Sequence, residues 1–239
     1  MWQQLTVLDD TTPDDLRPVL QPLPTMTRTG TRLLDAASDL FYLRGVRAVG
    51  VDLIAETAGT TKKTLYDRFG SKDALVALYL LRRAHRWRGH LLAHLTAAGI
   101  DVEGSAGSPA DDPTDADLAR DHRARGDDRN HDDGRRRERA VLLVFDALQT
   151  WMGTQRRGCA FVNAYAELGD GEHPAVPVVR AEKAWMRRLF DTLTGDPAQG
   201  AHLHLLYEGT LVVLTAGADP RAAAEARRCV GLVMAGAST

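Results

Sequence analysis

The chain has 239 residues, 44% of them hydrophobic, which is enough for one large domain or two small ones around a buried core. Its net charge of −2 excludes a uniformly basic nucleic-acid coat protein, so any binding to a polyanion must come from local clustering of positive charge. Two cysteines, no basic signal region and no apolar run near the roughly 18 residues of a membrane span argue against a secreted, disulfide-stapled or membrane protein, and we expect a cytoplasmic location.

Residues 1–25 combine acidic residues with prolines and show little periodicity. This composition predicts a flexible acidic arm. In the folded parts of the chain that follow, apolar residues recur three and four positions apart, the spacing of an α-helix, and almost nowhere do they alternate over the length of a strand. The sequence therefore predicts an all-α fold.

Residues 51–69 have the pattern of a helix-turn-helix. A short apolar stripe stops at Gly59, and a second short helix follows, with Thr61 as its N-cap and with Leu65 and Phe69 holding it on the core. In such a motif the second helix can enter the major groove of DNA. The pattern therefore predicts an element that reads double-stranded DNA.

The face of this second helix opposite Leu65 is polar. Lysines and threonines crowd its N-terminus, where free backbone N–H groups already attract phosphate. Helical rotation turns Lys63 and Asp67 furthest outward. Asp67 either lies beside an exocyclic amine of a base or forms an ion pair with Lys63, and the sequence leaves both alternatives open.

Positive charge gathers in the same part of the chain. Residues 28–100 contain twelve Lys and Arg against six Asp and Glu, so this segment carries +6 and the remainder −8. A basic head on an acidic body is expected when one end of a protein meets a phosphate backbone and the other does not.

A long helix is predicted after Ser71, running to about residue 98. Residues 101–134 then hold glycines, prolines and dense mixtures of Asp and Arg, which cannot bury enough apolar surface to offset chain entropy. We expect a disordered insertion there, either a solvated linker or a partner-binding segment. The last two predicted helices are apolar enough to form a dimer interface. Helices beyond the insertion are predicted at about 136–155, 160–168, 174–194, 199–217 and 220–235.

Three strings of residues resemble a known family. They are Leu33-Leu-Asp-Ala-Ala-Ser-Asp-Leu-Phe41, Ile54-Ala-Glu-Thr-Ala-Gly59 and Thr64-Leu-Tyr-Asp-Arg-Phe-Gly-Ser-Lys-Asp-Ala-Leu75. Together they resemble the amino-terminal domain of the TetR family of transcriptional regulators, over about residues 27–80. Further on, Gly158-Cys-Ala-Phe-Val-Asn-Ala-Tyr-Ala-Glu167 is similar to a stretch in the ligand-binding domain of one branch of that family.

The resemblance implies a helix-turn-helix DNA-binding domain at residues 26–72, followed at residues 73–239 by a helical ligand-binding and dimerisation domain. It implies a homodimer that binds a palindromic operator in double-stranded DNA, in most cases as a repressor, and that a small-molecule effector of unidentified chemistry releases. It implies neither an enzyme nor a cofactor. The chain departs from the family pattern at Gly50, where a Ser or Thr cap is expected. The residues that would contact DNA are Arg28, Thr61, Lys62, Lys63, Thr64, Tyr66, Arg68 and Lys72.

An effector pocket would be lined by aromatic walls with a few polar groups, although ordinary core packing accounts for each candidate as well. His90 and His94 have the spacing of a metal-binding pair, but no third ligand stands at a matching distance, so we expect no metal site. Cys159, beside a helix start, could be a reactive thiol or a buried structural one. The alternative function is thus a helical ligand-binding or thiol redox-sensing protein without DNA binding. The pocket candidates are Phe145, Trp151, Phe161, Asn163, Tyr165, Trp185, Tyr207 and Glu208.

Overall fold

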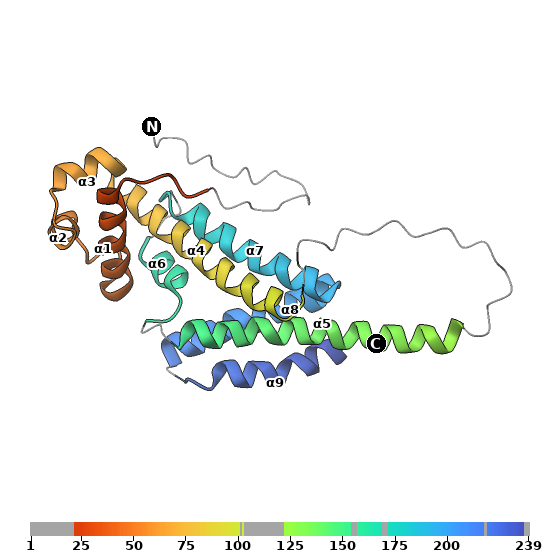
Figure 1. Ribbon diagram of the computed structural model, residues 1–239. Helices are drawn as coiled ribbons and strands as arrows, with labels where there is room; N and C mark the ends of the chain where they lie inside the picture. The colour runs from red at the N-terminus through yellow and green to blue at the C-terminus, as the bar shows by residue number, and fades with distance from the viewer. Residues whose placement is uncertain are drawn as a thin grey trace. The chain divides into compact units, whose positions relative to one another are not determined.

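The computed structural model describes residues 22–100, 102, 122–153, 157–168, 172–217 and 219–236, and for residues 122–131 only the backbone. Throughout these residues the regular structure is helical, with no β-strand (Figure 1). The predicted all-α fold with an amino-terminal helix-turn-helix is confirmed.

The first three helices are α1 (Arg28–Arg44), α2 (Val51–Thr57) and α3 (Lys62–Phe69). Thr61 caps α3 as predicted, because its hydroxyl accepts a hydrogen bond from the Thr64 N–H at 3.1 Å. Gly70, with φ of 74°, ends that helix. No side chain caps α2 at Gly50. One apolar core joins the three helices, and its fully buried side chains include Leu33, Leu34, Ala37, Ile54 and Leu65.

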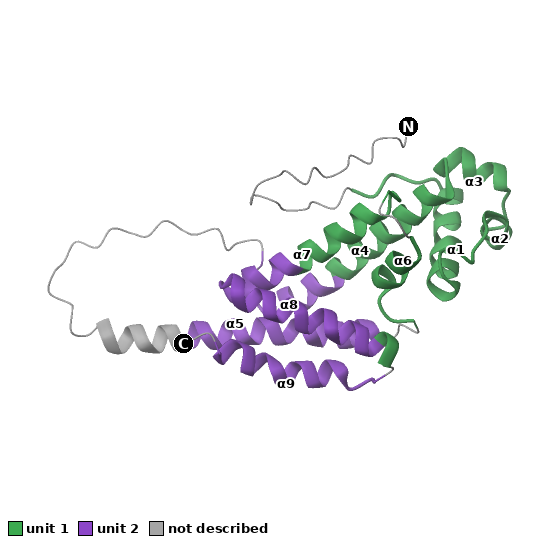
Figure 2. Ribbon diagram, turned by 180° about the vertical axis from the view of Figure 1, so that it is seen from behind, with its two compact units in different colours: residues 1–89, 154–186, 215–218 green, residues 90–153, 187–214, 219–239 purple. Residues whose placement is uncertain are grey.

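The chain forms two compact units, coloured separately in Figure 2. Unit 1 comprises residues 1–89, 154–186 and 215–218. It holds α1 to α3, most of α4 (Lys72–Ala97), α6 (Ala160–Leu168) and the first part of α7 (Val176–Thr194). The Ser71 hydroxyl caps α4 by accepting from the Ala74 N–H at 3.0 Å, which is the predicted start of the long helix.

A buried ion pair joins α4 and α7 inside unit 1. The Arg88 Nε donates to Glu182 Oε2 at 2.8 Å, and the side chains are only 10% and 2% exposed. The Arg88 guanidinium also lies over the Trp185 ring, 4.4 Å from its centroid. Burial lowers the pKa of Arg88, and the Glu182 carboxylate opposes that shift.

Unit 2 comprises residues 90–153, 187–214 and 219–239. Its helices include α5 (His122–Met152), α8 (Pro197–Val212) and α9 (Ala222–Ala235), and α9 packs against both α5 and α8 (Figure 2). A short π-helical turn, η1 (Val213–Gly217), continues α8. The rings of Phe145, Phe190 and Tyr207 form a buried aromatic cluster, with centroids 5.8–6.4 Å apart.

Two sequence predictions fall largely outside the described residues. Of the expected arm at residues 1–25, only residues 22–25 are described, and of the expected insertion at 101–134, only residue 102 and the start of α5. Helix α5 begins at His122 instead of near residue 136. A polar segment can remain helical when opposite charges stand one turn apart, as Asp132 and Arg135 do at 3.8 Å. No helix in the described ranges is long and apolar enough to cross a membrane.

Candidate nucleic-acid interface

The turn between α2 and α3 is fixed by backbone and side-chain contacts. Gly59 has φ of 61°, a conformation that favours glycine, and the Thr60 N–H donates to the Ala55 carbonyl at 2.9 Å. Arg32 of α1 donates to the Gly59 carbonyl at 3.3 Å. From the sequence, Arg32 contributes only to the positive charge of residues 28–100. Its role in bracing the turn has no local sequence signal.

The outward face of α3 carries an ion pair. Lys63 Nζ lies 2.7 Å from Asp67 Oδ2, one helical turn away, and the side chains are 84% and 59% exposed. Of the two alternatives left open for Asp67, the structure shows the ion pair with Lys63. Both groups lie opposite Leu65 and Phe69, which are buried.

The first residues of α3 contact both α2 and one another. Lys62 Nζ lies 3.1 Å from Asp52 Oδ2 on α2, and both side chains are at least half exposed. The hydroxyls of Thr61 and Thr64 are 2.9 Å apart. Together with the Thr61 cap, these contacts hold the exposed N-terminus of the helix in one arrangement.

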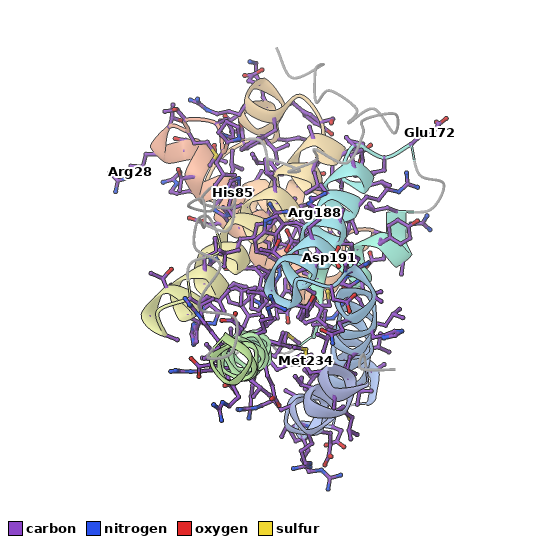
Figure 3. The ribbon with its side chains drawn as sticks, turned by 90° about the vertical axis from the view of Figure 1, so that its right-hand side faces the viewer. Arg28, His85, Glu172, Arg188, Asp191 and Met234 are labelled. Atoms are coloured by element: carbon purple, nitrogen blue, oxygen red, sulfur yellow. The ribbon has the colours of Figure 1, made fainter. Side chains whose placement is uncertain are left out.

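The remaining predicted DNA contacts lie on α1, α3 and the start of α4. Tyr66 is 41% exposed, and Lys72 is the half-buried first residue of α4. Arg68 runs close to Gly30, which places the end of α3 beside the start of α1. Arg28, the first residue of α1, projects away from the helices (Figure 3). Unit 1 therefore carries all the predicted contacts on neighbouring segments.

The predicted pocket residues divide between the units. Unit 1 holds Phe161, Asn163, Tyr165 and Trp185, of which Tyr165 is 45% exposed and Phe161 is buried. The Asn163 side chain donates to the Arg157 carbonyl at 2.6 Å. It also lines a hollow of about 10 Å³, beside Tyr42 and Tyr79, with room for at most one water molecule. Burial raises the pKa of Tyr79.

In unit 2 the structure brings Phe145 and Tyr207 together in the aromatic cluster. Trp151 packs on His90, with ring centroids 5.4 Å apart, and Glu208 lies 3.4 Å from His204 Nε2. These are contacts within a packed helical core. Because ordinary core packing accounts for these contacts, the assignment of these residues to an effector pocket stays a prediction.

Helix α6 and the residues just before it contact α1 and the loop after α1, and the sequence did not predict these contacts. The Tyr42 hydroxyl donates to the Gly158 carbonyl at 3.2 Å and accepts from the Arg157 N–H at 2.9 Å. Glu167 Oε2 accepts from the Arg47 N–H at 2.7 Å. Gly45 has φ of 91°, and a Cβ there would lie 2.6 Å from Glu167 Oε1, so only glycine admits this approach.

The cysteines and the histidine pair occupy packed positions. Cys159 is buried, with its N–H donating to the Thr215 hydroxyl at 3.1 Å, and Cys229 is half-buried; both thiols are free. The rings of His90 and His94 stand 4.5 Å apart. Within the described part of the chain no three His, Cys, Asp or Glu side chains are grouped to hold a metal ion.

Comparison with known proteins decides the nature of this domain. Residues 33–79 match the TetR_N family model, described as bacterial regulatory proteins of the tetR family. Over these residues the chain is similar to the amino-terminal domain of tetR-family regulators. The likeness extends beyond it, since a crystal structure of a TetR-family transcriptional regulator from Streptomyces coelicolor superposes with a TM-score of 0.66 at 26% identity, covering 88% of this chain and 96% of the other.

Curated relatives match over about a quarter of this chain. An uncharacterized HTH-type transcriptional regulator of Mycobacterium tuberculosis is 42% identical over 55 residues, covering 23% of this chain and 27% of the relative. The HTH-type transcriptional activator FasR of Mycolicibacterium smegmatis is 47% identical over 60 residues, covering 25% and 27%. The chain thus spans about a quarter of the length of these relatives. The similarity in sequence is thus limited to a short segment, whereas the similarity in fold extends over most of the chain.

Proposed function

We propose that the chain is a transcriptional repressor that binds a palindromic operator as a homodimer and is released by a small-molecule effector. The observation that carries the proposal is the exposed polar face of α3, opposite a buried Leu65, on a TetR-family domain. In a helix-turn-helix this face is the one that enters the major groove.

Charge and exposure divide the DNA contacts into two kinds. Lys63 and Thr64 stand on or beside the outward face of α3, where they would meet base edges. Tyr66, Lys62 and Lys72 flank that face and would contact phosphates. Thr61 positions the helix through its cap, and Arg28 and Arg68 extend the positive surface toward the start of α1.

Homodimerisation is supported by exposed apolar side chains on two helices of unit 2. Leu205 and Val212 of α8 are 68% and 52% exposed, and Leu232 of α9 is 76% exposed. Helices α8 and α9 pack together, so a second copy of the pair would cover these side chains. Two copies of α3 would then read the two halves of a palindrome.

Release by an effector requires a second site coupled to the first. The contacts of Tyr42 with the residues just before α6, and of Arg47 with Glu167 on α6, supply a physical connection between the TetR-family domain and the helices that follow it. We place the effector in unit 1, among the predicted side chains on α6 and α7, namely Phe161, Asn163, Tyr165 and Trp185. The other predicted lining residues, Phe145, Trp151, Tyr207 and Glu208, belong to unit 2 and form a separate candidate set.

Selection from random and genomic duplexes with the full chain tests the proposal. We expect a palindromic sequence whose log affinity falls steeply with log salt concentration. Lys63→Glu and Tyr66→Ala should abolish binding and leave the dimer folded, whereas Arg139→Glu, an exposed charge reversal on α5, should bind like the parent. A reporter gene behind the selected operator should be repressed. Equal affinity for all duplexes at low salt would refute the assignment of α3.

A further inference from the structure

We propose that Lys63 and Asp67 act as one unit that reads a single oriented G·C base pair in each operator half-site. Lys63 donates to guanine, and Asp67 accepts from the amino group of the paired cytosine. The inference rests on the proposed function, because only a recognition helix in the major groove brings the pair to base edges.

The ion pair is already formed and faces away from the protein. Its Nζ and Oδ2 atoms are 2.7 Å apart, and both side chains are mostly exposed, at 84% and 59%. The two residues stand one turn apart on α3, opposite the side that Leu65 and Phe69 bury. A donor and an acceptor are therefore presented side by side to whatever α3 approaches.

The edge of a G·C pair in the major groove has the complementary pattern. Guanine offers the acceptors N7 and O6, and cytosine next to it offers the N4 amino donor. O6 and N4 are joined by the hydrogen bond of the base pair, so they lie about 2.9 Å apart. This spacing matches the 2.7 Å between Lys63 Nζ and Asp67 Oδ2. Both side chains can face their complements without breaking the ion pair.

Other base pairs fit less well. A T·A pair offers an acceptor and a donor in the same order, but it sets the thymine methyl beside the ammonium and the adenine N7 lone pair beside the carboxylate. A C·G pair in the reversed orientation sets donor against ammonium and acceptor against carboxylate. The expected order of affinity is G·C, then T·A, then the reversed pairs.

The same pairing explains an acidic side chain on the surface that meets DNA. A carboxylate facing the duplex is repelled by phosphates unless a donor on the DNA offsets the repulsion. The Asp67 side chain is 59% exposed, more than Lys62 at 50% and less than Lys63 at 84%. A helix that brings Lys63 into the groove therefore brings Asp67 into it as well. The cytosine amino group is the donor that this position can reach.

Binding measured for all four base pairs at each half-site position tests the inference. The parent homodimer should show one symmetric position at which G·C is preferred to T·A by about tenfold per half-site, and to C·G by more. Exchange of the two residues, Lys63→Asp with Asp67→Lys, should invert the preference to C·G. Asp67→Asn should shift it toward T·A, because asparagine binds adenine N6 and N7 together.

Asp52→Asn is the matched control, because Asp52 forms a similar exposed ion pair with Lys62 at 3.1 Å but joins α3 to α2. It should change the affinity for all four base pairs by the same factor. Thermal unfolding of each variant checks that it is folded. If the exchange variant does not fold, the base preferences of Asp67→Asn and Lys63→Gln decide whether the pair reads the base pair. Operator binding with an unchanged base preference in these variants would overturn the inference alone. A folded parent that selects no duplex would overturn the proposed function.

Discussion

Replacing Glu182 by glutamine should lower the free energy of unfolding by about 3 kcal/mol. Glu182 is 2% exposed and its partner Arg88 10%, so the substitution leaves a buried cation without its counter-charge. Breaking a buried ion pair on one side costs about 3–5 kcal/mol. Glutamine keeps an oxygen that can accept from Arg88 Nε, which places the expected loss at the lower end. The Trp185 ring, 4.4 Å from the guanidinium, still stabilises the cation.

Urea unfolding at one fixed chain concentration measures this loss, because the stability of the proposed homodimer would depend on concentration. The matched control replaces both partners by apolar residues, Arg88→Met with Glu182→Leu, and should range from neutral to about 4 kcal/mol stabilising. A free energy of unfolding for Glu182→Gln within about 0.5 kcal/mol of the parent's would be the effect of an ordinary surface substitution. It would show that the two side chains do not form a buried charge pair in solution.

Three further substitutions probe other parts of the chain. Gly45→Ala should lower the free energy of unfolding in urea by about 2 kcal/mol, because φ is 91° at this position and a Cβ would lie 2.6 Å from Glu167 Oε1. Adding Glu167→Ala should relieve the clash but not the backbone strain, so full recovery of stability in the double variant would contradict the strain. Asp191→Asn should stabilise the protein at neutral pH, because burial raises the pKa of this carboxyl and folding then favours its protonated form. The parent should lose stability as pH rises through that raised pKa, and the variant should lack this slope; an identical slope would exclude Asp191 as its source. Leu232→Arg, at a side chain 76% exposed on α9, should dissociate the homodimer in sedimentation experiments, and an unaffected dimer would exclude α9 from the interface.

The amino-terminal domain could be predicted because its signals are local. The Thr61 cap, the stop at Gly70 and the spacing of Leu65 and Phe69 all lie within ten residues of one another, and each has a direct consequence for backbone or core. The outward position of Lys63 and Asp67 followed from helical geometry alone. The sequence could not show which of its two alternatives Asp67 adopts, because that depends on the side-chain conformations of Lys63 and Asp67.

The contacts between α1 with the loop after it and α6 with the residues just before it could not be predicted in the same way. Tyr42 and the Gly158 carbonyl are 116 positions apart in the chain, and a tyrosine on a helix carries no sign of its distant partner. Gly45 ends α1, and its lack of a side chain also admits Glu167, an approach that no local pattern indicates. The start of α5 at His122 was not predicted, because a low apolar content indicates disorder, whereas opposite charges one turn apart, as at Asp132 and Arg135, also favour a helix.

The strength of the α6 contacts limits how an effector can act. The hydrogen bond from the Arg47 N–H to the Glu167 carboxylate contributes about 1.5–3 kcal/mol, and each hydrogen bond of the Tyr42 hydroxyl about 0.5–1.5 kcal/mol, less where solvent reaches them. Loss of one or two of these hydrogen bonds is of the same order as the roughly 1–3 kcal/mol typical of coupling between sites. None of these contacts touches α3, whose turn is held separately by Arg32. An effector acting through them should therefore weaken operator binding equally for all sequences, and the base preference at the Lys63 and Asp67 position should be the same with and without it.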